Sequence, residues 1–210
     1  MSRYRTRSWR AFDPGATRLQ PACAVGASLR ILGLDPGSRR TGYGVIERRG
    51  TDWVHVAHGC VTVAAAEETL AERLRVIFES LRELIAAHGP GEVAIERVFV
   101  NRNVDSALKL GQARGAALCA VPKGLPVFEY APRAIKLALV GSGAAEKPQV
   151  AHMIRTLLGL QGRVSPDASD ALAVAICHAH SRRLQELALQ AAAPACERGE
   201  TPEMTQPSSR

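Results

Sequence analysis

The sequence predicts an α/β domain with a mixed five-stranded sheet, in which three antiparallel strands are followed by two parallel strands, flanked by helices. Three apolar runs separated by Gly-containing segments are typical of an antiparallel meander, and they lie at 31–34, 43–46 and 54–63. A helical stretch then precedes each of two further strand-like runs, at 92–100 and 126–130. Because strands that alternate with helices favour parallel crossovers, these two runs complete a mixed sheet.

The predicted helices are identified by their apolar spacing and by the residues that end them. The clearest covers 68–88, because its apolar residues form one stripe and Gly89-Pro90-Gly91 stops the helix. That stripe consists of Leu70, Leu74, Ile77, Phe78, Leu81, Leu84 and Ile85. A helix over 106–121 is rich in small residues, and its Gly111 and Gly115 predict close packing against another helix. Polar residues at 101–105 predict a loop, and further helices are predicted over 132–140, 145–158 and 171–191.

The composition indicates a folded chain in a reducing compartment. Of the 210 residues, 46% are hydrophobic, which excludes general disorder, and no apolar run is long enough to span a bilayer. The five cysteines include no Cys-x-x-Cys pair, so we expect neither a disulfide framework nor a zinc site. Cys119 and Cys177 lie in apolar helical runs, where buried free thiols are common. We therefore predict a cytoplasmic protein with no membrane partner.

Charge and composition divide the chain into one domain and two tails. The net charge of +7 permits a polyanionic partner but does not require one. Residues 1–28 hold five Arg and one Asp, and we interpret them as a disordered or non-native basic extension; a transit peptide and a nucleic-acid-binding arm are the alternatives. Residues 29–190 form the predicted domain, and 191–210 form a predicted disordered tail.

Four carboxylates lie where burial is costly unless a cation is near. Asp35 ends the first strand before a Pro-Gly pair, and its alternative interpretation is an ordinary turn aspartate. Glu96 lies in the fourth strand, where the alternative is an edge position facing water or an Arg. Asp167 and Asp170 are three residues apart at the start of the last helix and share one face, and the alternative is that they only cap that helix.

These four acids predict a metal centre. In a β-β-β-α-β order the fourth strand is expected beside the first, and the last helix is expected to begin across the strand ends. Carboxylates that close cannot all ionise unless cations are present. A set of oxygen ligands without Cys or His points to two Mg²⁺ ions, for which Mn²⁺ substitutes, and such a pair promotes displacement at a phosphodiester.

The motifs that carry these acids resemble a known family. The segments GLDPGSRRTGYGVI (33–46), AIERVFVNRNVDSALKLGQARGAAL (94–118) and PDASDALAVAICHAH (166–180), with the intervening 126–158, are similar to the bacterial RuvC Holliday-junction resolvases. The resemblance covers about residues 30–180. It implies an RNase H-like fold and a homodimer that nicks two opposing strands of a four-way DNA junction to give ends that a ligase can seal.

The resemblance also implies roles for individual residues and a partner. It implies catalytic and metal-binding roles for Asp35, Glu96, Asp167 and Asp170. It implies that Phe99 stacks on junction bases and that Lys136 and Lys147 contact DNA near the cleaved phosphate. We also predict a DNA contact for Arg39, from the basic pair after Asp35. The family works with the RuvA–RuvB branch-migration complex.

Three other functions compete with this interpretation. An actin-like sugar kinase also begins with a strand, an Asp and a Gly-rich turn, but it needs a second such domain that this chain lacks. Another RNase H-like nuclease, acting on RNA, would keep the acids without Phe99, Lys136 and Lys147. A junction-binding protein that does not cleave would tolerate loss of an acid, and none of the four is missing.

Overall fold

The structure is a computed structural model and describes residues 28–63, 69–97 and 104–192. Its strands are β1 (Arg30–Asp35), β2 (Arg40–Arg49), β3 (Asp52–Thr62), β4 (Glu92–Glu96) and β5 (Val127–Tyr130). Its helices are α1 (Leu70–His88), α2 (Val104–Ala120), α3 (Pro132–Val140), α4 (Lys147–Leu157) and α5 (Pro166–Ala192).

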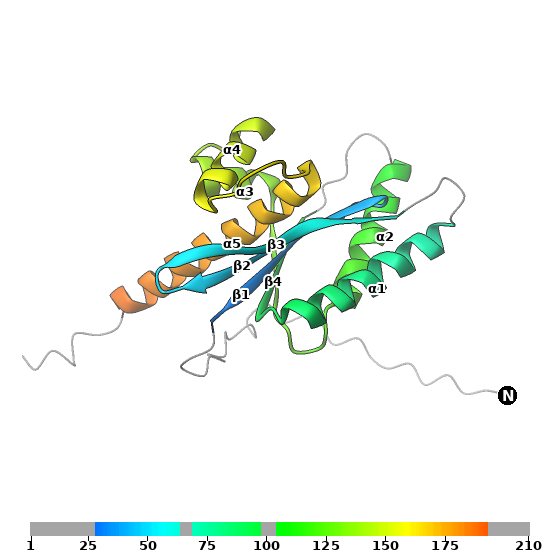
Figure 1. Ribbon diagram of the computed structural model, residues 1–210, viewed down its shortest axis with the longest axis horizontal. Helices are drawn as coiled ribbons and strands as arrows, with labels where there is room; N and C mark the ends of the chain where they lie inside the picture. The colour runs from blue at the N-terminus through cyan, green and yellow to red at the C-terminus, as the bar shows by residue number, and fades with distance from the viewer. Residues whose placement is uncertain (1–27, 64–68, 98–103, 193–210) are drawn as a thin grey trace, which may run out of the picture.

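The five strands form one mixed sheet in the order β3-β2-β1-β4-β5 (Figure 1). β1, β2 and β3 pair antiparallel, whereas β4 pairs parallel with both β1 and β5. The predicted sheet is therefore confirmed, together with the RNase H-like architecture that the resemblance implies. The topology places β1 at the centre, so the residue that follows its buried run is flanked by strands on both sides.

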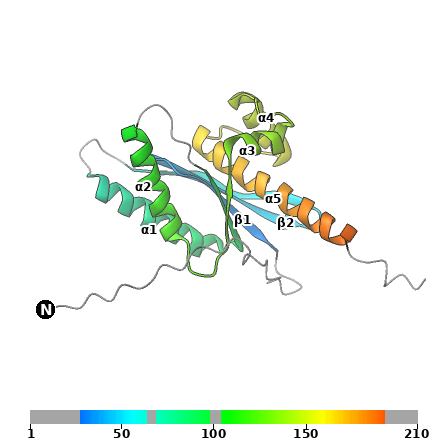
Figure 2. The same cartoon turned by 180° about the vertical axis from the view of Figure 1, so that it is seen from behind.

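The alternation of side chains along the strands gives each face of the sheet its own helical layer (Figures 1 and 2). Leu32 and Leu34 of β1 pack with Ile95 of β4 against α1 and α2. Ile31 and Ala94 belong instead to the core shared with α3, α4 and α5. Since side chains alternate with a period of two, Asp35 and Glu96 lie on the α5 face.

Three glycines on the α5 face let the helix backbone approach the sheet, and we call them the glycine seam: Gly33, Gly42 and Gly44. A Cβ at Gly33 would collide with the carbonyl oxygen of Ala171, and one at Gly42 would collide with that of Asp167. Gly33 is opposite Gly44 in the β1–β2 pairing, and Gly42 is opposite Asp35. The seam therefore brings the first turns of α5 directly over the end of β1.

Several details differ from the sequence prediction. β4 ends at Glu96 rather than continuing to 100, and α5 begins at Pro166, five residues before the predicted start. Cys177 is buried as expected, but Cys119 is exposed. Gly111 and Gly115 have open space where a Cβ would stand, so the close packing predicted for them does not occur within the described part of this chain. The buried face of α2 consists of Ala113, Ala117 and Ala120.

None of the helices within the described ranges is long and apolar enough to cross a membrane. The three cysteines in these ranges, Cys60, Cys119 and Cys177, are free thiols. Residues 1–27 and 193–210 lie outside the described residues, so the proposed tails stay predictions.

Candidate active site

Asp35 and Glu96 are neighbours at the same edge of the sheet. β1 and β4 run parallel with Leu34 opposite Ile95, and Asp35 and Glu96 are the next residues of the two strands. The two carboxyl groups share a hydrogen bond. The Pro-Gly turn after Asp35 is held by the buried Thr41, whose hydroxyl donates to the Gly37 carbonyl at 3.2 Å. Among the described residues, the side chain that bonds to the backbone of this turn is thus Thr41, whereas Asp35 faces Glu96.

The pair holds a proton in the absence of cations. Burial, followed by the charges of Glu96 and Asp170, raises the pKa of Asp35 from 3.8 to about 8. Burial also raises the pKa of Glu96, while its hydrogen bond with Asp35 acts in the opposite direction. At neutral pH the protonated Asp35 carboxyl therefore donates to Glu96, and the site carries less negative charge than its acids could supply.

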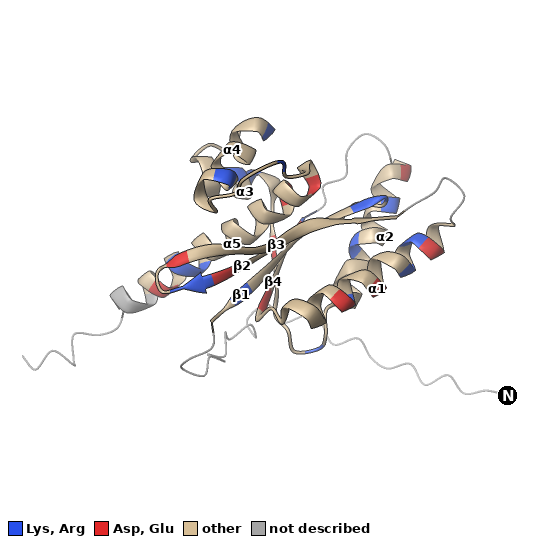
Figure 3. Cartoon of the chain, viewed as in Figure 1, with Lys and Arg blue, Asp and Glu red and all other residues tan. Residues whose placement is uncertain are grey.

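Asp170 extends this cluster from the first turns of α5. Its Oδ2 atom lies 2.8 Å from Nζ of Lys147, the first residue of α4. This hydrogen bond is the largest cause of a raised pKa at Lys147, and the charges of Asp35 and Glu96 add to it. The charge of Lys136 on α3 lowers the pKa of Glu96, so both predicted DNA-contact lysines act electrostatically on the acids. Figure 3 shows Lys and Arg on α3 and α4 beside an acidic start of α5.

Asp167 lies next to this cluster but has partners of its own. Its Oδ2 atom is 3.0 Å from Arg40 Nε and 3.9 Å from Cys60 Sγ. Asp167 is in the first turn of α5, whereas the hydroxyl of Ser165 accepts from Ala168 N–H at 3.3 Å and caps the helix. The structure thus brings Asp35, Glu96 and Asp170 into one electrostatic cluster, with Asp167 held beside it by Arg40.

The acids near the end of β1 suit divalent cations but do not form a complete coordination sphere. Within the described ranges, no group of three or more His, Cys, Asp or Glu side chains is arranged to hold a metal ion as it stands. The donors near β1 are all carboxylate oxygens, which suit Mg²⁺ and Mn²⁺. The raised pKa of Asp35 is caused in part by neighbouring acids, and a bound cation would remove that repulsion. The chemistry of these donors therefore suits a divalent cation, although their arrangement does not form a metal site as it stands.

The alternative position for Glu96 is wrong. β4 lies between β1 and β5 and is not an edge strand. Arg97 pairs instead with Glu129 of β5, at 3.4 Å, and Arg114 of α2 pairs with the same carboxylate at 2.7 Å. Both arginines therefore pair with Glu129, which leaves Glu96 facing the acid cluster.

The structure gives less information about two of the predicted DNA contacts, Arg39 and Phe99. Arg39 immediately precedes β2 and is exposed, and no ion pair involves it among the described residues. Phe99 lies outside the described residues. Sequence reasoning missed Arg40 as the partner of Asp167, and it missed the glycine seam. Gly42 and Gly44 are two residues apart, as are Gly33 and Asp35, so each pair lies on one face of its strand. Glycines at such positions are the signal in the sequence that another backbone approaches that face closely.

A separate polar network fixes the other end of α5 to the sheet. Glu92, at the start of β4, is buried and binds Arg182 and His178, whose Nε2 lies 2.8 Å from it. His178 Nδ1 lies 2.7 Å from the Tyr130 hydroxyl. A neutral imidazole satisfies both contacts if Tyr130 donates to Nδ1 and Nε2 donates to Glu92.

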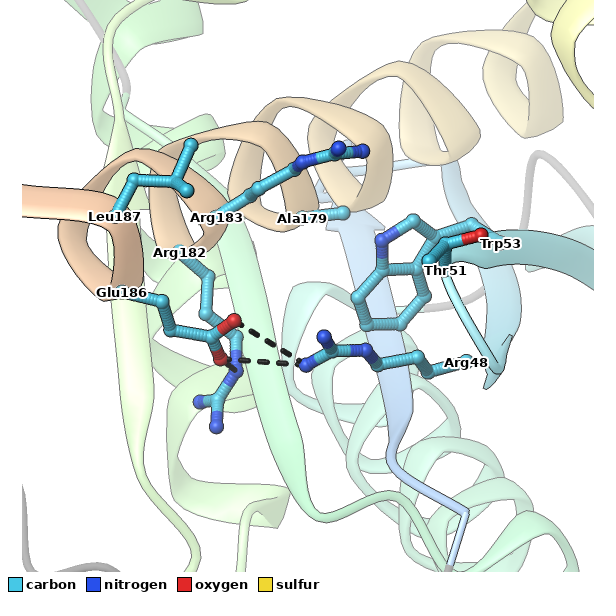
Figure 4. Close-up of a pocket in the computed structure, with 8 residues that line it drawn as sticks. All are labelled: Arg48, Thr51, Trp53, Ala179, Arg182, Arg183, Glu186 and Leu187. Atoms are coloured by element: carbon cyan, nitrogen blue, oxygen red, sulfur yellow. Dashed lines mark hydrogen bonds and ion pairs between the residues drawn. The ribbon is translucent and has the colours of Figure 1, made fainter. Parts of the chain in front are cut away.

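The same network borders a small cavity of about 140 Å³ between α5 and the β2–β3 hairpin (Figure 4). Glu186 bridges its two sides, lying 3.3 Å from Arg48 and 3.2 Å from Arg182. These contacts anchor α5 far from Asp35, because Arg48 is six residues along β2 from Gly42, or about 20 Å of extended chain.

Comparison with known proteins agrees with the geometry. Residues 31–178 match the family model of the crossover junction endodeoxyribonuclease RuvC. The chain is similar to two proteins of that name. It is 56% identical over 157 residues to the one from Alkalilimnicola ehrlichii, covering 74% of this chain and 94% of the relative. It is 55% identical over 155 residues to the one from Methylococcus capsulatus, covering 73% and 92%.

Solved structures give the same picture. The chain is similar to Thermus thermophilus RuvC in complex with a Holliday junction substrate, with a TM-score of 0.70 and 34% identity over 75% of this chain and 96% of that one. The yeast mitochondrial Holliday junction resolvase shares the fold, with a TM-score of 0.56 over 77% of this chain and 86% of that one, at 11% identity.

Proposed function

The chain belongs to the RuvC family of crossover junction endodeoxyribonucleases, and from this premise we propose that it resolves four-way DNA junctions by nicking two opposing strands. The observation that carries the proposal is the cluster of Asp35, Glu96 and Asp170 at the end of the sheet, with Lys136 and Lys147 beside it. Buried acids with nearby lysines suit a reaction in which an anionic phosphodiester meets divalent cations.

We assign the metal-binding and catalytic roles to Asp35, Glu96, Asp167 and Asp170, which together would hold two Mg²⁺ ions per subunit, with Mn²⁺ as a substitute. When bound, such ions supply the charge that activates water and stabilises the departing 3′ oxygen. For the acids to bind these ions, the Asp35–Glu96 pair must release its proton. Asp167 must exchange its ion pair with Arg40 for a metal ion, and Asp170 must exchange its ion pair with Lys147 in the same way. Hydrolysis breaks the P–O3′ bond and leaves a 3′ hydroxyl and a 5′ phosphate, which a ligase can rejoin.

We assign substrate binding to the basic residues around the acids. Lys136 and Lys147 are positioned to bind phosphates of the cleaved strand once the acids are neutralised. Arg39 is exposed, and we propose that it adds a further phosphate contact. We keep Phe99 as the proposed residue that stacks on junction bases, on the strength of the family resemblance.

Symmetric nicking requires two copies of the chain, because each chain provides one acid cluster. We propose that the copies pair through the exposed face of α2. Val104 and Leu108 are 67% and 62% exposed there, and Gly111 and Gly115 lie on the same side with open space around them. An apolar face flanked by glycines allows two helices to approach closely. The RuvA–RuvB complex is the proposed partner of this dimer, and the cytoplasm is its proposed compartment.

The test is cleavage of a synthetic four-way junction, compared with a linear duplex and an RNA–DNA hybrid, in Mg²⁺ and in EDTA. We expect paired, symmetric nicks in the junction alone, and no nicks in EDTA. Cleavage of the hybrid or of RNA would instead support the alternative of an RNase H-like nuclease acting on RNA. Tight junction binding without nicks in Mg²⁺ would support the non-cleaving alternative.

A further inference from the structure

A groove next to the acid cluster is not used by the proposed reaction. It has a volume of about 410 Å³ and lies between α4, the start of α5 and the segment that joins them. One edge of the groove is the Lys147–Asp170 ion pair, so the groove opens directly beside the proposed site of cleavage. Its size lies within the range of pockets that bind small organic groups.

The groove is lined by apolar side chains and by two cationic ones. We call the apolar lining the floor, and it consists of Pro148, Ala151, Ile154, Val164 and Pro166. Arg155 and Arg163 also line the groove, both are exposed, and neither has an ion-pair partner among the described residues. A ligand that suits this groove therefore combines a flat or apolar body with negative charge at its margin.

Ser169 supplies a buried polar group to the same groove. Its residue is only 7% exposed and lines the groove from α5. Within the described ranges its hydroxyl has no hydrogen-bond partner, although its backbone N–H donates to Ser165. The hydroxyl is therefore free to donate to, or accept from, a ligand that enters the groove.

We propose that this groove binds one unpaired nucleotide of the cleaved strand, next to the scissile phosphate. The base lies on the apolar floor, an edge of the base bonds to the Ser169 hydroxyl, and the flanking phosphates bind Arg155 and Arg163. Base extrusion into an apolar pocket read by a few polar groups is an established way for proteins to hold a nucleotide outside the stack. This inference rests on the proposed function and adds a base-reading site to it.

Other ligand classes fit the groove less well. An isolated phosphate or metal ion gains nothing from five apolar side chains on the floor. A neutral metabolite would leave both arginines without anionic partners. A single nucleotide provides a flat base and charged phosphates together.

The first experiment places 2-aminopurine at each nucleotide that flanks the scissile phosphate of a synthetic four-way junction. The Asp35→Asn variant is used in Mg²⁺, because the junction then stays intact. We expect an increase in fluorescence at one flanking position, and loss of that increase when Ser169→Ala is added. If fluorescence is unchanged at every flanking position, no base leaves the stack there and the inference is wrong.

The second experiment fills the groove and removes the base in turn. Ala151→Phe adds bulk to the floor, and His152→Phe adds the same bulk at the next, exposed position of α4, which does not line the groove. On an intact junction we expect Ala151→Phe to slow single-turnover nicking about tenfold, the scale of a lost pocket contact, and His152→Phe to leave it unchanged. On a junction with an abasic nucleotide at the position identified by fluorescence, Ala151→Phe is expected to have no effect.

The outcomes separate this inference from the proposed function. If the parent enzyme makes no paired nicks in the junction, the proposed function fails, and the groove inference that rests on it fails as well. If the parent enzyme nicks normally but Ala151→Phe slows intact and abasic junctions equally, only the groove inference fails. Thermal unfolding of each variant identifies a slowing that comes from loss of the fold.

Discussion

At Asp35, burial and two nearby carboxylates favour the protonated side chain. Its pKa of about 8 in the folded state compares with 3.8 for the group without these neighbours. The folded chain thus keeps a proton that the unfolded chain loses as pH rises above about 4. Stability therefore falls between about pH 4 and pH 8 in the absence of divalent cations, because the unfolded state binds fewer protons across that range.

The Asp35→Asn variant tests this linkage. The substitution removes the titratable carboxyl at position 35. The free energy of unfolding of the variant is therefore expected to exceed that of the parent by about 1–3 kcal/mol at pH 8, and the two values are expected to differ little at pH 4. Urea denaturation in EDTA at the two pH values measures the difference. Parallel pH profiles for the two proteins would contradict the assignment. The same variant is expected to bind junctions and to fail to nick them, and normal nicking would overturn the two-metal assignment.

Glu92 is a second buried acid whose partners can be tested by substitution. It is the only acid in contact with His178 among the described residues, and it also binds Arg182. Glu92→Ala leaves that buried polar network without its acceptor and is expected to lower the free energy of unfolding by about 3 kcal/mol. Glu79→Ala, at an exposed position of α1, is the matched control and is expected to change stability little. Equal urea midpoints for the two variants would show that the network does not stabilise the fold.

At the scale of elements, α5 connects the chemistry to the sheet. Its first turns rest on the glycine seam, and its later turns are held by Glu92 and Glu186. Asp167 and Asp170 therefore have little freedom to move relative to β1. This explains how two acids on a helix and two on strands come together without long, flexible side chains between the backbones.

Gly42→Val is the sharpest test of the seam, because its side chain would enter the space of the Asp167 backbone. We expect a loss of about 1–3 kcal/mol in stability from overpacking. Nicking is expected to fall about 100-fold, because displacement of the helix start misplaces two acids. Ala86→Val, at an exposed position of α1, is the control, and it is expected to change both stability and nicking little. Unchanged nicking by Gly42→Val would show that α5 adjusts without moving its acids.

Most elements were predictable because their signals are local. The apolar stripe of α1 and the Gly89 stop depend only on neighbouring residues, and the structure places α1 at Leu70–His88. The position of Glu96 beside Asp35 followed from topology and alternation. Contacts that depend on strand register or on segments far apart in the sequence could not be predicted from such local signals. The pairing of Arg40 with Asp167 joins residues that are far apart in the sequence, and the exposure of Cys119 depends on which face of α2 meets α1.

At the scale of the whole molecule, two copies are needed for two nicks. Leu108→Glu places a charge on the exposed face of α2 and is expected to shift the protein to monomers in sedimentation experiments. Paired nicks are then expected to become slow, single nicks. Leu184→Glu is the control on α5, where Leu184 is 68% exposed, and it is expected to leave both properties unchanged. If Leu108→Glu stays dimeric, another surface forms the interface.

The N-terminal segment gives a further prediction at this scale. Deletion of residues 1–28 is expected to leave the nicking rate and junction affinity unchanged, because the proposed site lies within 35–170. Binding is measured over a series of salt concentrations. A large loss of affinity that shrinks as salt is added would show instead that the five Arg of this segment bind phosphate.

The glycine seam has a consequence for redesign of the protein. The spacing between the strand acid Asp35 and the helix acids is set where main chain meets main chain, at Gly42 and Gly33. Of the core side chains on this face, Leu172 also meets the seam, at Gly44. An engineer can therefore exchange most of the aliphatic core for other side chains of equal volume and retain the arrangement of the acids, provided that the three glycines are left in place.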